Sequence, residues 1–218
     1  MNASPGINVL LAGATGLVGR ECLDLILADP AFAHVTAIVR RPLPPQAGFQ
    51  KLTRVTIDFD RLGEHPAIFY VDQIFCALGT TMRKAGSQSA FRRVDFEYPL
   101  RIAELGLARG AGHFLLISSM GADSRSPVFY NRVKGELEDA ITKLGYRSLT
   151  IVRPSLLLGD RVEWRLGEEV AQRFGFLMPS RFRPIPVRTV ARALVRAARE
   201  GVPGRRVIDN RELQTLPR

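Results

Sequence analysis

The 218-residue sequence predicts an α/β fold, in which a doubly wound parallel sheet lies between two layers of helices. Two patterns indicate this three-layer α/β/α architecture. Short apolar runs, typical of buried strands, alternate along the chain with longer segments whose apolar residues recur every three or four positions. The first of these strands leads into a helix through a glycine-rich turn. A composition of 46% hydrophobic and 24% charged residues is that of an ordinary globular protein.

The first strand and the turn after it are the most informative stretch. Residues 7–12 are mostly apolar, as in a strand buried on both faces, and residues 17–28 carry apolar residues at helical spacing. We expect Gly13 to permit a sharp turn, Gly16 to let backbone amides approach a ligand, and Gly19 to let the helix pack near the strand. A helix that starts in this way offers N–H groups and a positive dipole end to a pyrophosphate. A loop that binds nothing is the alternative.

The next two strands are predicted at residues 35–39 and 54–57. Arg40 and Arg41 follow the first of them, where a dinucleotide fold faces the adenosine ribose. An acidic residue there would accept a hydrogen bond from the 2′-hydroxyl, whereas an arginine pairs with a 2′-phosphate. The sequence therefore predicts NADP(H) rather than NAD(H), with a solvated arginine pair as the alternative. At the end of the second strand, Asp58 and Phe59 are candidates to contact the adenine, or Asp58 stabilises a turn.

The later strands end in residues that we expect at one edge of the sheet, where open α/β sheets bind ligands. These strands are predicted at residues 73–77, 113–117 and 149–152, with a last short strand at 206–209. The residues at their carboxyl ends are Ala77, Leu78, Gly79 and Thr80, then Ser118 and Ser119, then Pro154 and Ser155. Gly79 would let the backbone lie against a cofactor.

Helices are predicted at residues 89–108, 129–145 and 187–199, each with one apolar face. Residues 80–89 form either a lid over the cofactor or an ordinary solvated connection. After residue 159 the pattern weakens to a helix over 162–176 and a loop rich in proline and arginine. We expect a single domain, to which residues 159–218 add a small substrate-side region.

The net charge of +10 points to an anionic partner. The basic residues are scattered and lack the aromatic interleaving of RNA-binding motifs, so we expect an anionic cofactor or substrate rather than nucleic acid. Arg192, Arg196 and Arg199 share the outer face of the last helix, which is typical of a solvated surface.

Nothing in the sequence indicates membrane insertion or secretion. No apolar run approaches the ~18 residues of a membrane span, and residues 1–6 lack the regions of a signal peptide. We therefore expect a cytoplasmic protein without membrane contact. Cys22 and Cys76 lack metal-ligand spacing and are expected in the core of a reduced protein.

Tyr130 and Lys134 are four residues apart on a predicted helix, so their side chains rise from the same face. A phenol, with a pKa of about 10, is a poor acid–base catalyst at neutral pH, but a nearby ammonium and an oxidised nicotinamide both stabilise phenolate. Tyr130 is thus a candidate proton donor to a carbonyl as hydride arrives, with Ser119 bonded to the same oxygen. The alternative is that Tyr130 and Lys134 are merely a pair on the surface. The order along the chain of the glycine turn, the serine pair and Tyr130 argues against it.

These motifs resemble the short-chain dehydrogenase/reductase superfamily, in its extended or atypical branch. The resemblance rests on Gly13-Ala14-Thr15-Gly16-Leu17-Val18-Gly19, Ser118-Ser119, and Tyr130 to Lys134. More narrowly, residues 76–81, 91–95, 118–122, 130–138 and 153–155 are similar to the Tat-interacting oxidoreductase-like group.

The resemblance implies a Rossmann fold, NADP(H) binding and a catalytic set of Ser119, Tyr130 and Lys134. Lys134 would hold the nicotinamide ribose, and the backbone at Pro154 and Ser155 would flank the nicotinamide. The sequence departs from many relatives at Asp95, where they carry asparagine, and in a C-terminal region shorter than that of extended members.

The sequence therefore predicts an NADP(H)-dependent oxidoreductase that acts on a small carbonyl or alcohol. An anionic substrate would suit the positive charge of the chain. An NADPH-binding regulator or redox sensor without turnover is the first alternative, because the fold and the cofactor do not determine function. A nucleotide-sugar epimerase is the second, although no residues for a nucleotide-sugar pocket are evident. Monomer and homodimer both stay open.

Overall fold

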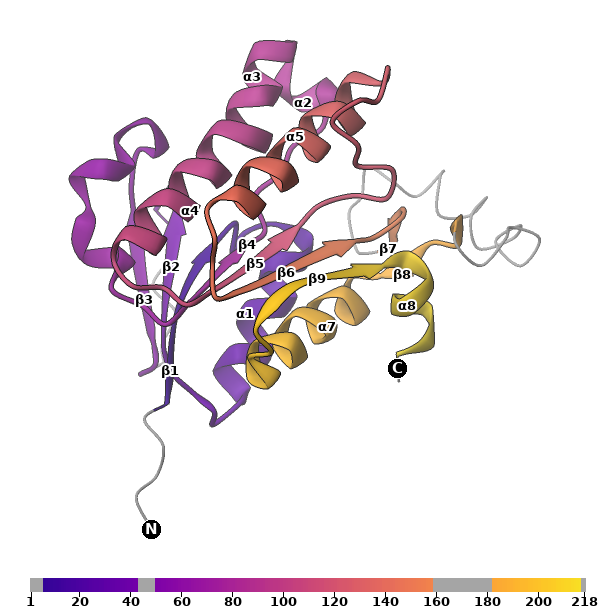
Figure 1. The fold of residues 1–218 in the computed structure, drawn as a ribbon. Coiled ribbons are helices and arrows are strands. Elements are labelled where there is room, and N and C mark those ends of the chain that lie inside the picture. Colours follow the sequence, from indigo (N-terminus) through magenta and orange to yellow (C-terminus); the bar gives the residue numbers. More distant parts are fainter. Residues whose placement is uncertain (1–5, 43–49, 159–181, 217–218) are drawn as a thin grey trace.

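The structure is a computed structural model that describes residues 6–42, 50–158 and 182–216. Its centre is a seven-stranded sheet in the order β3-β2-β1-β4-β5-β6-β9, with every neighbouring pair parallel (Figure 1). The strands are β1 (Ile7–Ala12), β2 (Phe32–Val39), β3 (Leu52–Thr56), β4 (Gln73–Cys76), β5 (His113–Ile117), β6 (Ser148–Arg153) and β9 (Gly204–Asp209).

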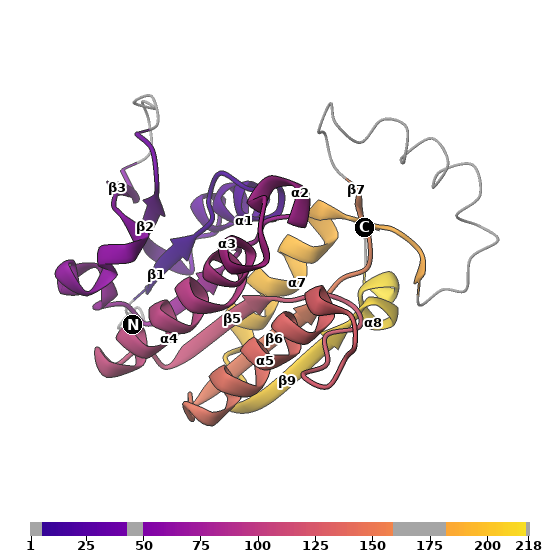
Figure 2. The ribbon, with the colours of Figure 1, turned by 90° about the horizontal axis from the view of Figure 1, so that it is seen from above.

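Helices cover both faces of this sheet, which confirms the predicted three-layer α/β/α fold. On one face lie α1 (Leu17–Ala28) and α7 (Val187–Glu200). On the other lie α4 (Tyr98–Ala108) and α5 (Phe129–Lys143), which run side by side over the sheet in Figure 2. The central strands are apolar almost throughout because they are buried on both faces.

The strand order reverses next to β1, which pairs with β2 on one side and β4 on the other. In an open parallel sheet a ligand-binding crevice forms at such a switch point, outside the carboxyl ends of the strands. The loops after β1 and β4 therefore stand at the expected place for a dinucleotide.

Several boundaries differ from the sequence prediction. β2 begins at Phe32, three residues before the predicted start. The helix predicted at 89–108 consists of α3 (Gln88–Arg92), a π-helical turn (Arg93–Glu97) and α4. Elements that the sequence did not indicate are two 3₁₀ turns (Phe59–Glu64 and Pro66–Phe69), α2 (Met82–Ala85), β7 (Leu157–Leu158), β8 (Ile185–Pro186) and α8 (Asn210–Thr215).

The C-terminal part of the described chain belongs to the body of the fold. α7 packs against α1 beneath the sheet, and β9 forms its edge beside β6. The predicted helix over residues 162–176 lies outside the described residues. Cys22 and Cys76 are both buried, as predicted.

Candidate functional site

The segments predicted to form the site meet at the carboxyl edge of the sheet. The glycine turn follows β1, Arg40 and Arg41 follow β2, residues 77–80 follow β4, and the serine pair follows β5. The strand ends are joined there by backbone hydrogen bonds, since Met120 N donates to Pro154 O over 2.8 Å. The parallel sheet therefore gathers these segments at a single edge.

The glycine turn packs directly on the end of β4. Gly13 has a φ of +89°, and a Cβ there would lie 2.5 Å from the carbonyl oxygen of Ala77. A Cβ on Gly19 would collide with the carbonyl oxygen of Gly13. Both positions therefore exclude any larger residue, and α1 approaches the strand closely.

The amino end of α1 is open to an anion. Gly16 occupies the N-cap position without a side-chain hydrogen bond, and the first turn has no acidic residue. Among the described residues no side chain caps the N–H groups of that turn, and the helix dipole favours negative charge there. Thr15 is exposed beside this turn, whereas the side chain of Val18 is buried in the core.

A buried ion pair joins α5 to the π-helical turn. Lys134 Nζ lies 2.7 Å from Asp95 Oδ1, and the two side chains are 4% and 1% exposed. The second carboxylate oxygen of Asp95 accepts a hydrogen bond from Thr80 N over 2.8 Å. Burial by itself lowers the pKa of Lys134, but the Asp95 carboxylate and the Tyr130 phenol hold that pKa above its usual value.

Tyr130 stands one helical turn before Lys134 on α5. Its side chain is half-buried, and its ring packs on Phe91 of α3 with the ring centres 5.4 Å apart. The apolar contact fixes the ring while the phenol lies within electrostatic reach of Lys134. α5 thus presents a phenol and an ammonium together.

The two adjacent serines have different surroundings. Ser118 Oγ donates to Glu138 Oε1 over 2.5 Å, and Arg153 Nε also donates to this buried carboxylate, over 2.9 Å. Ser119 is 9% exposed, and within the described residues its buried hydroxyl has no hydrogen-bond partner. A buried hydroxyl without a partner is costly unless a ligand supplies one.

Other predicted residues have structural contacts. Phe59 is buried in the core, where its ring packs on Tyr98. Asp58 accepts from Asp60 N over 3.0 Å and so caps the following turn. Ser155 Oγ donates to the carbonyl oxygen of Arg183 over 2.6 Å. These three side chains therefore have partners within the fold itself.

Arg40 and Arg41 are both exposed, and no acidic residue of the described chain pairs with either one. The edge therefore offers an uncapped helix, a free hydroxyl and exposed guanidinium groups. These features fit a long, phosphate-bearing dinucleotide.

Two contributors were not predicted. In the sequence, Asp95 stands out only within the 91–95 stretch of the resemblance and as a departure from relatives, and an acidic residue by itself predicts exposure rather than burial. For Glu138, the sequence gave no indication of a role except its position one helical turn after Lys134. Its bonds to Ser118 and Arg153 depend on contacts between distant parts of the chain.

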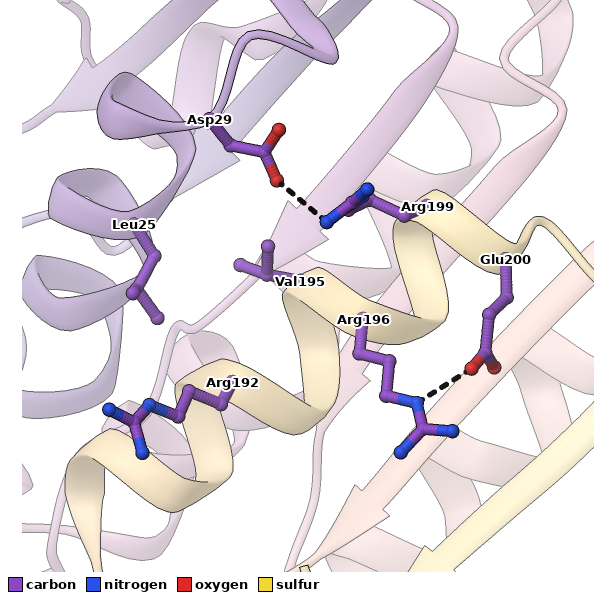
Figure 3. Close-up of a pocket in the computed structure, with 7 residues that line it drawn as sticks. All are labelled: Leu25, Asp29, Arg192, Val195, Arg196, Arg199 and Glu200. Atoms are coloured by element: carbon purple, nitrogen blue, oxygen red, sulfur yellow. Dashed lines mark hydrogen bonds and ion pairs between the residues drawn. The ribbon is translucent and has the colours of Figure 1, made fainter. Parts of the chain in front are cut away.

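A cavity of about 460 Å³ lies apart from this edge, between α1 and α7 (Figure 3). Leu25 and Asp29 of the α1 region and Arg192, Val195, Arg196, Arg199 and Glu200 of α7 line it. Arg199 lies 3.5 Å from Asp29, and Arg196 lies 2.7 Å from Glu200. Such exposed pairs contribute little to stability, and none of the predicted cofactor or catalytic residues lines this cavity.

Comparison with known proteins identifies relatives over most of the chain. A family model described as NAD(P)H-binding matches residues 13–200. Protein HTATIP2 of Rattus norvegicus is 41% identical over 193 residues, which cover 86% of this chain and 79% of that protein. Protein FMP52, mitochondrial, of Candida albicans is 33% identical over 207 residues, which cover 91% of this chain and 90% of that protein.

Solved structures share the fold. MoeE5 in complex with UDP-glucose and NAD superimposes with a TM-score of 0.71 at 18% identity, over 92% of this chain and 74% of that one. A UDP-glucose 4-epimerase from Thermotoga maritima, with UDP-glucose, gives a TM-score of 0.70 at 15% identity, over 92% and 75%. At such low identity the likeness shows the fold alone.

The expectation of a cytoplasmic location is contradicted by these comparisons. Relatives from Candida albicans, Emericella nidulans and Scheffersomyces stipitis are named as mitochondrial proteins. The absence of an apolar membrane span and of a secretory signal does not distinguish a cytoplasmic from a mitochondrial protein. Within the parts of the chain that the structure describes, no helix is long and apolar enough to cross a membrane.

Proposed function

We propose, from the premise that this chain belongs to the NAD(P)H-binding family, that it is an NADP(H)-dependent oxidoreductase acting on a small carbonyl or alcohol. The observation that carries the proposal is the buried hydroxyl of Ser119 at the sheet edge, which has no hydrogen-bond partner among the residues that the structure describes. A substrate oxygen would supply its missing hydrogen-bond acceptor.

Different residues at the edge of the sheet bind different parts of the cofactor. The open amino end of α1 takes the diphosphate, because its N–H groups lack side-chain acceptors. The exposed Arg40 pairs with the 2′-phosphate, and Arg41 adds positive charge beside it. Lys134 donates to the nicotinamide ribose, and the backbone at Pro154 flanks the nicotinamide. When bound, the cofactor supplies or accepts the hydride.

The chain's own contribution to the reaction is to orient the substrate and move a proton. Ser119 donates to the substrate oxygen and so fixes its position. Tyr130 exchanges a proton with the same oxygen as charge develops there. The Lys134 ammonium, one turn away, stabilises the phenolate that Tyr130 becomes after it donates.

The proposal predicts that Tyr130→Phe retains NADPH binding and loses turnover. Purified protein is tested with NADPH against a panel of small aldehydes and ketones, with NADPH absorbance as the signal. We expect the turnover of the variant to be at least about 100-fold lower than that of the parent, because phenylalanine has no proton to donate to the carbonyl oxygen. The control is Tyr70→Phe, which changes a side chain that is 69% exposed and should turn over like the parent.

Unchanged turnover in Tyr130→Phe would remove the phenol from the mechanism. If the parent protein binds NADPH but consumes none with any carbonyl or alcohol tested, an NADPH-binding regulator replaces the enzyme as the better reading. That role uses the same cofactor site and needs no proton donor.

A second prediction concerns the choice of cofactor. Arg40→Ala should weaken NADPH binding by about tenfold or more and leave NADH binding unchanged, because only NADPH carries the 2′-phosphate. Calorimetric titration with each cofactor measures both affinities. Arg101→Ala, at an exposed position on α4, is the control. A parent protein that binds NADH as tightly as NADPH would overturn the role of Arg40.

A further inference from the structure

We propose that Asp95 is a positioning residue that fixes the Lys134 ammonium and balances its charge towards the nicotinamide, and so sets the preference of the site between oxidised and reduced cofactor. The inference rests on the proposed NADP(H) binding and adds to it a determinant of redox-state preference. It concerns a residue outside the set of Ser119, Tyr130 and Lys134.

The contacts of Asp95 tie together two segments that the cofactor would touch. One carboxylate oxygen lies 2.7 Å from Lys134 Nζ, and the other accepts from Thr80 N over 2.8 Å. A Cβ on Gly79 would lie 3.4 Å from Asp95 Oδ1 and 3.9 Å from Lys134 Nζ. The backbone after β4 therefore runs directly over the ion pair, and Asp95 fixes both that backbone and the ammonium.

The fold encloses this carboxylate with little access to water. Asp95 lies within the π-helical turn Arg93–Glu97 and is fully buried. A π-helical turn inside a longer helix is a frequent mark of a functional site. A charged carboxylate or ammonium is unfavourable when it is buried alone, so each of these two groups depends on the other.

The charge balance of the cluster is the basis of the inference. Besides Asp95, the groups that act on Lys134 are Tyr130 from α5 and Cys76 from β4. Burial raises the pKa of Cys76 to about 11, so its thiol adds no charge at neutral pH. Asp95 and Lys134 together carry no net charge.

Oxidised nicotinamide carries a positive charge that the reduced ring lacks. A lone ammonium in a poorly solvated site would repel that charge, and a lone carboxylate would attract it. The Asp95–Lys134 pair does neither. Removing either partner should therefore change the ratio of the two cofactor affinities, in opposite directions for the two residues.

The test measures Kd for NADP⁺ and for NADPH by calorimetry without substrate, at about pH 6 and about pH 8, because lower pH favours the lone ammonium of Asp95→Asn and higher pH favours the lone carboxylate of Lys134→Met. In Asp95→Asn the ratio Kd(NADP⁺)/Kd(NADPH) should rise by about tenfold, because the ammonium is left without its counter-ion. In Lys134→Met the ratio should fall by a similar factor. The double variant should return to within about twofold of the parent, because it contains neither charge.

Any loss of affinity that both cofactor forms share, such as a lost hydrogen bond from Lys134 to the ribose, cancels in the ratio of the two Kd values. The control is Glu104→Gln, which breaks an exposed ion pair with Arg101, 3.2 Å long, on the same helical run. Thermal unfolding is followed for each variant. If Asp95→Asn does not fold, Lys134→Met and the double variant still test the predicted fall and its reversal.

A ratio that moves in the same direction in both single variants, or does not move, would overturn the inference. In that outcome the parent protein still binds NADP⁺ and NADPH, so the proposed cofactor binding stands. A parent protein that binds neither form would refute the proposed function and this inference together.

Discussion

At the scale of single residues, Ser118 and Ser119 show how neighbouring positions acquire different roles. Successive side chains of an extended backbone point to opposite sides. The Ser118 hydroxyl bonds to the buried carboxylate of Glu138, whereas the Ser119 hydroxyl has no partner among the described residues. Ser118 therefore contributes to stability, and Ser119 is available to a substrate.

We predict that the two alanine variants separate stability from turnover. Ser118→Ala should lower the free energy of unfolding by about 1–3 kcal/mol, because Glu138 loses a donor. Ser119→Ala should leave stability within about 0.5 kcal/mol and reduce turnover by about tenfold to a thousandfold. Urea denaturation and the NADPH assay measure the two effects. The opposite pattern would show that the roles are exchanged.

At the scale of elements, α5 carries most of the site. Tyr130, Lys134 and Glu138 recur at four-residue spacing along its length, so they lie on one side of the helix. Next to Lys134, Gly135 faces the backbone of Asp123 and Ser124, and a Cβ there would collide with that backbone. The loop that follows Ser119 therefore lies directly against the helix.

Gly135→Ala tests this close approach. Alanine in a helix is normally favoured over glycine by about 1 kcal/mol. Here we expect a loss of about 1–3 kcal/mol in the free energy of unfolding, because the loop or the helix must shift. The control is Gly112→Ala, just before β5, where no atom of the described residues lies within 4 Å of the added Cβ. Stabilisation by Gly135→Ala would contradict the packing described.

At the scale of the whole molecule, the sheet is a buried layer in which polar groups need partners. His113 begins β5 and is almost fully buried, and its Nε2 lies 2.9 Å from the hydroxyl of Thr150 on β6. Burial disfavours the charged ring and lowers the pKa of His113 to about 4. The folded protein therefore resists protonation at this position, which links its stability to pH.

We predict that stability falls with acidity in a way that depends on His113. A histidine in an unfolded chain has a pKa of about 6.5. Between that pH and about 4 the unfolded chain binds a proton that the folded chain does not, so stability is progressively lost as the pH falls. The loss should reach about 2–3 kcal/mol at about pH 4.5 relative to pH 7. In His113→Gln this part of the loss should be absent. Equal pH dependence of the two proteins in urea denaturation would contradict the assignment.

The local hydrophobic pattern was sufficient to predict the larger helices and strands. The first helix has the predicted limits, Leu17–Ala28, and so does the fifth strand, His113–Ile117, because hydrophobic spacing and the flanking glycines are properties of adjacent residues. The π-helical turn was not predictable, because one inserted residue hardly disturbs the periodicity of a long helix. β2 was predicted too short because His34 interrupts its apolar run.

The sequence by itself determined the doubly wound sheet, the glycine turn and the edge at which the strands deliver their polar residues. Each of these follows from spacing within a short stretch of chain. Only the tertiary structure decided that Asp95 pairs with Lys134, that Phe59 belongs to the core, and that within the described residues Ser118 has a hydrogen-bond partner while Ser119 has none. The partner of a buried polar group is supplied by whichever distant segment packs against it, and no local pattern records that choice.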